Sequence, residues 1–207
     1  AYSSYSEVGY AVQDGANNTR QLRGLFASNF GMPDKTFLVG HSMGGLIAIS
    51  YGVTNRPQPD LYVLSAPALE ADVPAPLKVA AKALSTVLPT MRMPNSITGE
   101  QLCRDPDVGE AYFADPLVET KATTRFGANF IGQMEKLRGE LDHMHTPALV
   151  IHGADDELVP PRASAPLAAL PGVERKLFPG LRHETHNEPE QREVLTFVAD
   201  WIDAQLA

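Results

Sequence analysis

Residues 37–50 read FLVGHSMGGLIAIS, with Ser42 between glycines at positions 40 and 44. The apolar run before the serine predicts a buried strand, and the run after it predicts a buried helix. The chain turns sharply between them, so Ser42 is expected in a strained conformation, with glycine required two residues before and after it. This G-x-S-x-G pattern is typical of a nucleophile elbow. It predicts Ser42 as a nucleophile and the N–H of Met43 as an oxyanion donor, the alternative being a glycine-rich turn without chemistry.

Length and charge limit the classes of protein to which the chain can belong. Its 207 residues, 43% of them hydrophobic, suffice for one domain, or for one domain with an inserted cap. The net charge of −8 argues against nucleic acid as a partner and against tight binding to anionic membranes. The single cysteine, Cys103, can form neither an internal disulfide nor a metal cluster of thiolates. Without a membrane-length apolar run or a signal-like start, we expect a cytoplasmic protein, or a secreted one whose signal has been removed.

Strands and helices alternate at both ends of the chain. Strands are expected at 36–41, 61–65, 148–152 and 173–178, and helices at 17–30, after the elbow, at 162–170 and at the C-terminus. Such alternation predicts an α/β protein with a mostly parallel sheet flanked by helices. We assign residues 1–67 and 147–207 to this core.

Residues 68–146 interrupt the alternation. They carry apolar residues at helical spacing, no convincing strand, and several prolines that divide the segment into short pieces. An all-helical insertion between two strands predicts a cap, or lid, over the sheet edge where α/β proteins bind ligands. We expect residues 77–91 and 126–137 to line a tunnel for an acyl chain, unless they only pack the cap onto the core.

Two loops that follow predicted strands offer the acid and the base that a serine nucleophile needs. VIHGADDELVPP (150–161) contains Asp155 and Asp156, and FPGLRHETHNEPE (178–190) contains His183 and His186. Parallel strands place both loops at the edge where the elbow lies, and the chain order Ser, Asp, His is that of hydrolases with this elbow. We expect His183 to accept the proton of Ser42 while an aspartate fixes the histidine tautomer.

Other histidines are given no catalytic role. His143, His145 and His152 lack partners at metal-ligand spacing, so we place them at the hinge of the cap rather than around a metal. His41 lies inside the elbow and is expected to tune or shield the site. No metal or organic cofactor is expected.

Five motifs together resemble one known family: GHSMGGLIA, SAPAL, ADPLV, ALVIHGADDELVPP and FPGLRHETHNEPE. Over residues 36–206 the chain is similar to the monoacylglycerol lipases of the α/β-hydrolase superfamily and to the related lysophospholipase-like serine esterases. The resemblance implies an α/β-hydrolase fold, with Ser42 as nucleophile, Asp156 as acid and His183 as base. It also implies a mobile lid that admits single-chain glycerides.

The front of the chain departs from the family pattern. Only 41 residues precede Ser42, and AYSSYSEVGYAV (1–12) matches neither the HG turn that supplies the family's second oxyanion N–H nor the family's D-x-x-G-H-G-x-S loop. The N-terminal strands are therefore expected to be missing or reduced. We expect residues 1–12 to add an edge strand, or the chain to be a fragment, or to form a homodimer across that edge.

These features together predict a serine carboxylester hydrolase that cleaves monoacylglycerols or similar short to medium acyl esters through an acyl-enzyme. The expected partner is a small acyl ester, with no nucleic acid and no stable membrane insertion. The alternatives are a peptidase or perhydrolase on the same scaffold, or a truncated, weakly active relic that binds lipid. An epoxide hydrolase or dehalogenase is disfavoured, because those enzymes need a carboxylate where Ser42 stands.

Overall fold

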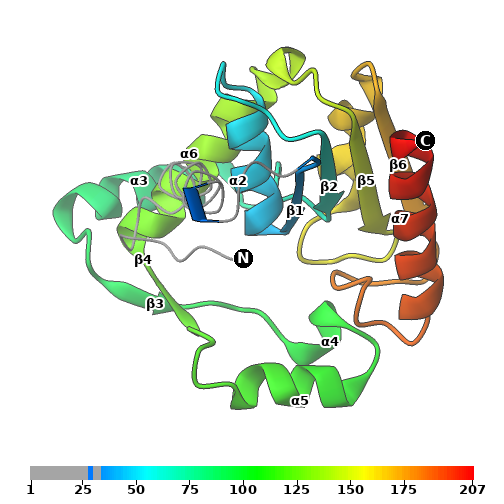
Figure 1. The fold of residues 1–207 in the computed structure, drawn as a ribbon. Helices are drawn as coiled ribbons and strands as arrows, with labels where there is room; N and C mark the ends of the chain where they lie inside the picture. The colour runs from blue at the N-terminus through cyan, green and yellow to red at the C-terminus, as the bar shows by residue number, and fades with distance from the viewer. Residues whose placement is uncertain (1–27, 30–33) are drawn as a thin grey trace.

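The computed structural model describes residues 28–29 and 34–207, and its centre is one parallel sheet. The strands are arranged in the order β1-β2-β5-β6 (Figure 1). Their bounds are Phe37–His41 for β1, Leu61–Ser65 for β2, Ala148–Gly153 for β5 and Val173–Phe178 for β6. The four predicted strands and the α/β class are therefore confirmed, each strand to within one residue at either end.

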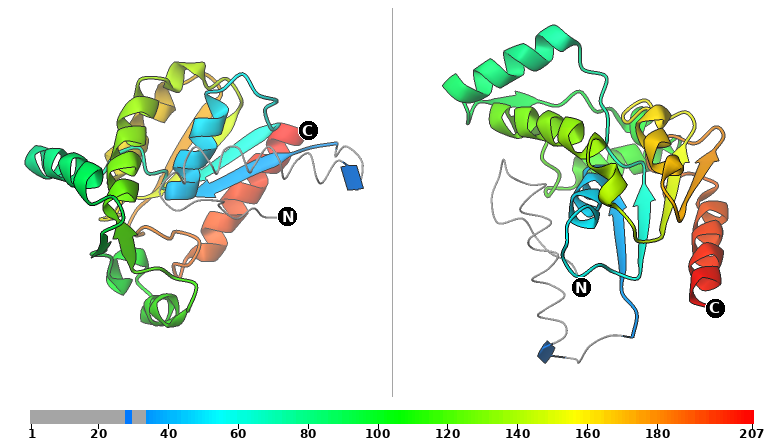
Figure 2. Two further views of the ribbon diagram at one scale, coloured as in Figure 1. Left: turned by 90° about the vertical axis from the view of Figure 1, so that its left-hand side faces the viewer. Right: turned by 90° about the horizontal axis from the view of Figure 1, so that it is seen from above.

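Alternate residues of the central strands face two separate hydrophobic cores, as the two-residue period of a strand requires. Tyr62 and Leu64 of β2 pack with helix α2 (Met43–Gly52), whereas Leu61 of the same strand packs with the opposite core. That opposite core includes Trp201 of α7 (Gln191–Leu206). Figure 2 shows α2 and α7 on opposite sides of the sheet. The two central strands are thus covered on both faces, which explains why every residue of β2 and β5 is buried.

The segment between β2 and β5 includes residues 68–146, which the sequence predicts to be a cap, and we keep that word as a name for these residues. Its elements are α3 (Ala75–Val87), β3 (Arg92–Pro94), α4 (Gly99–Leu102), α5 (Pro106–Ala114), β4 (Lys121–Thr123), α6 (Thr124–Arg138) and the 3₁₀-helix η1 (Leu141–His143). The expectation of an all-helical cap is wrong, because β3 and β4 pair as an antiparallel ribbon. Each strand has only three residues, too few to show an alternating pattern, and Pro94 itself argues against a strand. That the cap moves as a lid stays a prediction.

Two further expectations concern local structure. The predicted helix 162–170 is a 3₁₀-helix, η2 (Pro161–Ala169), which contains Pro166. The expected edge strand at residues 1–12 and most of the expected helix 17–30 lie outside the described residues. Within the described part, no helix has both the length and the apolar character needed to span a membrane.

Candidate active site

Ser42 lies at a sharp turn between β1 and α2. Its φ of 53° and ψ of −117° are strained values for a residue with a side chain. Hydrogen bonds hold the turn: the Ser42 N–H donates to the Ser65 carbonyl (2.9 Å), and the Ser42 carbonyl accepts from Leu46 (3.2 Å) and Ala68 (3.1 Å). The neighbouring strand and the loop after it therefore fix the backbone that carries the serine hydroxyl.

Close backbone packing explains two of the three glycines in this turn. A Cβ at Gly40 would lie 2.6 Å from the carbonyl carbon of Gly44, and one at Gly45 would lie 2.9 Å from Cα of Pro67. A Cβ at Gly44 would meet nothing within 4 Å. The expectation that crowding requires glycine two residues after the serine is therefore wrong, since the second crowded position is Gly45. The chain comes close to Gly40 because α2 begins directly after the serine.

Met43 is the first residue of α2, so its N–H has no acceptor within the helix. It follows Ser42 directly, and this is the position from which an elbow donates to an oxyanion. The sequence identifies no second donor, and residues 1–27 and 30–33 lie outside the described part of the chain.

Asp156 and His183 come together from the two predicted loops. Oδ2 of Asp156 lies 2.7 Å from Nδ1 of His183, and both residues are buried. Oδ1 of Asp156 accepts the N–H groups of Leu158 and Val159, each at 2.9 Å, which orients the carboxylate. The adjacent Asp155 is exposed. Of the two candidate acids, the structure thus brings Asp156 to the histidine.

A close contact between backbones keeps these two loops together. Gly153 ends β5, and a Cβ there would lie 2.7 Å from the carbonyl carbon of Leu181. The N–H of Asp155 also donates to the Leu181 carbonyl at 2.9 Å. Only glycine allows this approach, which places the acid loop against the loop that carries His183.

The electrostatics of the pair favour an ionised acid. Burial alone would raise the pKa of Asp156, but hydrogen bonds from His152 and His183 outweigh it and lower the pKa to about 2. Asp156 is therefore a carboxylate at neutral pH and can stabilise a protonated imidazole.

His41 lies in the site as a neutral side chain. Burial, together with the neighbouring His183 and His186, lowers the pKa of His41 to about 3. Its ring centroid is 4.6 Å from that of His183 and 5.0 Å from that of His186, and its Nδ1 lies 3.1 Å from the Ser65 hydroxyl. It packs beside His183 without adding a positive charge, and its role in tuning or shielding the site stays a prediction.

His152 is the residue that the sequence interpretation misplaced. It lies in β5 rather than at a cap hinge, is fully buried, and its Nε2 is 3.1 Å from Oδ2 of Asp156. Its Nδ1 is 2.8 Å from Oγ of Ser164. The sequence did carry a signal for this contact, because His152 lies at the end of a strand and four residues before the acid Asp156. A second serine, histidine and aspartate chain therefore shares Asp156.

The second chain differs from the first in its access to solvent. Ser164 is fully buried, and its hydroxyl is also bonded to the Pro161 carbonyl (3.1 Å) and to Nε of Arg175 (2.9 Å). Ser42, in contrast, lines a pocket of about 340 Å³ together with His183. Of these two serines, Ser42 is the one that borders a cavity.

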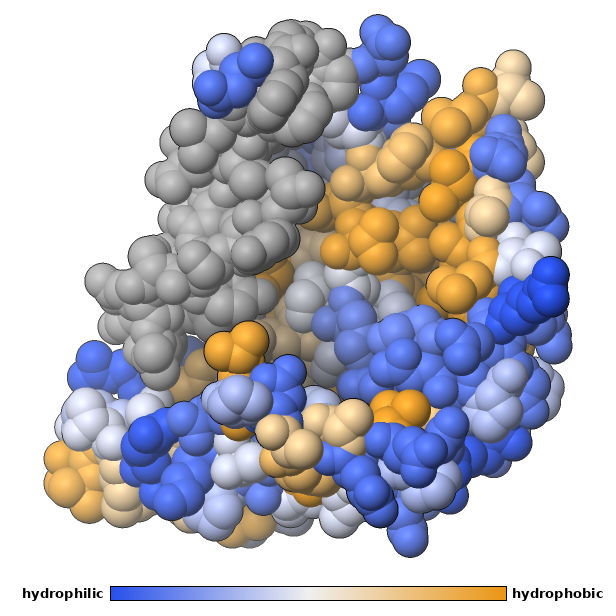
Figure 3. Space-filling model, turned by 60° about the horizontal axis from the view of Figure 1, so that its bottom comes forward, coloured by the Kyte–Doolittle hydropathy of each residue, from blue (hydrophilic) through white to orange (hydrophobic). Residues whose placement is uncertain are grey.

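This pocket lies between the core and the cap, and its wall is mainly apolar. The cap contributes Ile97, Leu102, Tyr112, Phe130 and Met134. Figure 3 shows a hollowed face on which hydrophobic residues gather beside polar ones. Ser42 and His183 both line the pocket, but within the described residues no hydrogen bond joins them. Of the two segments expected to line an acyl tunnel, α6 lines this pocket and α3 does not, since Leu77 and Val79 of α3 are exposed. That the pocket takes an acyl chain stays a prediction.

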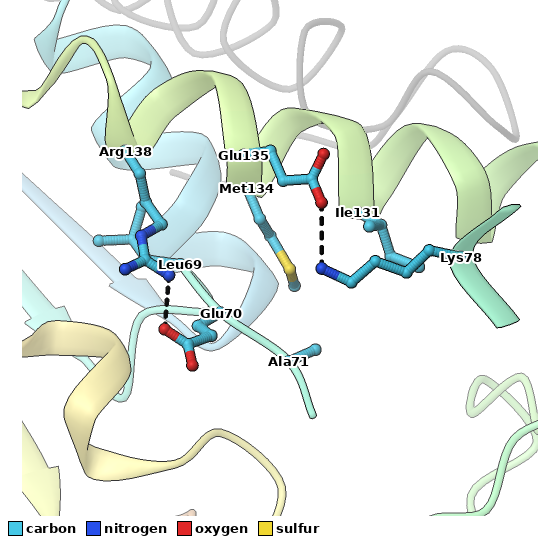
Figure 4. Close-up of a pocket in the computed structure, with 8 residues that line it drawn as sticks. All are labelled: Leu69, Glu70, Ala71, Lys78, Ile131, Met134, Glu135 and Arg138. Carbon is cyan, nitrogen blue, oxygen red and sulfur yellow. Dashed lines mark hydrogen bonds and ion pairs between the residues drawn. The ribbon is translucent and has the colours of Figure 1, made fainter. Parts of the chain in front are cut away.

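Ion pairs beside this pocket join parts of the cap to one another and, through Glu70 and Arg162, join the cap to the core. Glu70, in the loop after β2, pairs with Arg138 of α6 and, at 2.9 Å, with Arg162 of η2. Lys78 of α3 pairs with Glu135 of α6 at 3.0 Å, as Figure 4 shows together with the Glu70–Arg138 pair. Both pairs surround a smaller pocket lined by Met134.

Comparisons with known proteins agree with this geometry. The family model for Hydrolase_4, described as serine aminopeptidase S33, matches residues 8–190. The chain is 38% identical to a monoacylglycerol lipase of Mycolicibacterium smegmatis over 82% of this chain and 62% of that protein. It is 30% identical to phospholipase YtpA of Bacillus subtilis over 86% of this chain and 70% of that protein. The chain thus spans less than two thirds of the length of the mycobacterial relative.

A solved structure extends the likeness to the fold. The crystal structure of a monoacylglycerol lipase from Paleococcus ferrophilus superposes with a TM-score of 0.85 at 26% identity, covering 97% of this chain and 78% of that one. The chain therefore belongs to the serine aminopeptidase S33 (Hydrolase_4) family and has the α/β-hydrolase fold.

Proposed function

We propose that the chain carries the active site of a serine carboxylester hydrolase that cleaves monoacylglycerols or similar short to medium acyl esters. The observation that carries the proposal is the buried Asp156–His183 pair beside the pocket that the strained Ser42 also lines. The apolar wall of that pocket suits an acyl chain.

The reaction follows from these positions. Ser42 attacks the ester carbonyl while His183 takes its proton, and Asp156 stabilises the imidazolium that forms. The N–H of Met43 donates to the developing oxyanion. His183 then returns the proton to the departing alcohol, which leaves an acyl group on Ser42 for water to remove. This step proceeds without a cofactor.

A peptidase is the second candidate, because the pocket wall also contains two carboxylates, Glu70 and Glu184. A carboxylate could receive the cationic amino group of a peptide. Glu70, however, already pairs with Arg138 and Arg162, which leaves Glu184 alone for that task. The rest of the wall is mainly apolar, which favours an uncharged ester.

A substrate panel separates the candidates. Wild-type protein and Ser42→Ala are compared on monoacylglycerols of increasing acyl length and on aminoacyl anilides. We expect wild type to hydrolyse the esters at least about 100-fold faster than the anilides, and Ser42→Ala to lose several orders of magnitude. Faster turnover of the anilides would favour the peptidase. Lipid binding without turnover would indicate the lipid-binding relic.

A further inference from the structure

A buried carboxylate joins the loop that carries His183 to the cap. Glu188 lies five residues after the histidine, and its side chain is fully buried. Oε1 accepts the N–H of Arg182 at 2.7 Å, directly before His183. Oε2 accepts the N–H of Arg104 at 3.1 Å and its Nε at 3.0 Å. One side chain thus binds the histidine loop with one oxygen and the cap with the other.

Further hydrogen bonds join the same two segments, residues 102–104 of the cap and residues 182–188 of the histidine loop, and we call this contact the seam. The N–H of Glu184 donates to the Leu102 carbonyl at 2.8 Å, and the thiol of Cys103 donates to the Asn187 carbonyl at 3.0 Å. The cap segment 102–104 is therefore bonded to the residues on both sides of His183. Leu102 and Glu184 also line the active-site pocket, so an acyl chain there contacts both partners of the seam.

Among the side chains of this seam, we expect the loss of Glu188 to cost the most free energy. A buried carboxylate is costly unless it is paired and hydrogen-bonded, and here three N–H donors satisfy it. The outer end of Arg104 pairs with Glu190, which is exposed. Because an exposed ion pair contributes little, loss of Glu190 should be nearly neutral.

We propose that Glu188 is a positioning residue that couples the cap to His183. The inference rests on the proposed function, in which His183 is the base. Close contact with Gly153 holds the histidine loop from the side of β5, and Glu188 holds it from the side of the cap. A shift of residues 102–104 is thereby transmitted to His183, so that a substrate seated under the cap influences the placement of its own base.

The test compares Glu188→Gln with the matched control Glu190→Gln. Glutamine keeps the size of Glu188, but in either orientation its NH₂ group faces an N–H donor, of Arg182 or of Arg104. We measure the rate constant for labelling of Ser42 by a fluorophosphonate, per titrated site, and kcat and KM for one ester. Counting only titrated sites removes the effect of unfolded protein.

For Glu188→Gln we expect the rate constant per site and kcat to fall at least about tenfold, with KM changing less than about threefold. Glu190→Gln should stay within about twofold of wild type. Equal rate constants per site in the two variants would overturn the proposal. If Glu188→Gln does not fold, Arg104→Met serves instead. This variant keeps the bond from the N–H of residue 104 to Glu188 but loses the bond from the Arg104 side chain. The rate constant for labelling per site should fall at least about threefold, and an unchanged rate constant would likewise overturn the proposal. Failure of the proposed function would look different, because wild-type Ser42 itself would not be labelled.

Discussion

Replacing Asp156 by asparagine should leave the fold nearly intact and remove the function of His183. Oδ1 of Asp156 holds two backbone N–H groups, so the amide oxygen of asparagine should take that place. The NH₂ group then occupies the place of Oδ2, 2.7 Å from Nδ1 of His183. An NH₂ group there donates where the carboxylate accepted, which forces the proton of the imidazole onto Nε2. His183 could then no longer accept the proton of Ser42.

The size of the effect follows from this wrong tautomer. In serine hydrolases an asparagine in place of the acid lowers kcat by about 10⁴, which corresponds to about 5 kcal/mol of transition-state stabilisation. The control is Asp155→Asn, an exposed neighbour that should change kcat by less than about twofold. The assay is ester turnover, with melting curves to establish that both variants fold. Equal losses in the two variants would refute the assignment of Asp156 as the acid.

Three further predictions concern packing, acid stability and the pocket. Gly40→Ala should lower the free energy of unfolding by about 3 kcal/mol, whereas Gly44→Ala should be neutral or slightly stabilising, as chemical denaturation can show. Because the folded pKa of Asp156 is depressed to about 2, it should contribute up to about 2 kcal/mol of stability that is present above about pH 4 and lost as the pH falls through about 2. Unfolding of wild type and Asp156→Asn across that range measures this contribution, and parallel pH profiles would contradict it. Phe130→Ala should shift acyl-length preference by about tenfold and the exposed Leu77→Ala should not, so an equal response would argue against the pocket.

The sequence alone predicted the elements whose signals are local. β2 and β5 are largely apolar runs that are buried throughout, and the elbow has a glycine at position 40, where the turn is crowded. The meeting of Asp156 and His183 followed from topology, since loops after parallel strands gather at one edge of the sheet. The choice of Asp156 over Asp155 came from the family resemblance.

What the sequence did not reveal depends on contacts distant in the chain. The ribbon of β3 and β4 joins segments that carry no strand pattern of their own. The crowding at Gly45 comes from Pro67. His152 is the exception, because its partner Asp156 lies only four residues later in the sequence. The exposed face of α3 has the same helical periodicity as a pocket-lining helix, so periodicity alone could not tell which of α3 and α6 borders the pocket.

The most direct test of the central claim is to find which serine becomes covalently modified. Ser164 is connected to Asp156 through His152, and Ser42 shares a pocket with His183, the other histidine bonded to Asp156. Ser42 lines that pocket, whereas Ser164 is fully buried. Wild-type protein is treated with a fluorophosphonate, and the adduct is located by peptide mass spectrometry. We predict one adduct per chain, on Ser42, and none in Ser42→Ala. An adduct on Ser164, or one that persists in Ser42→Ala, would contradict the account.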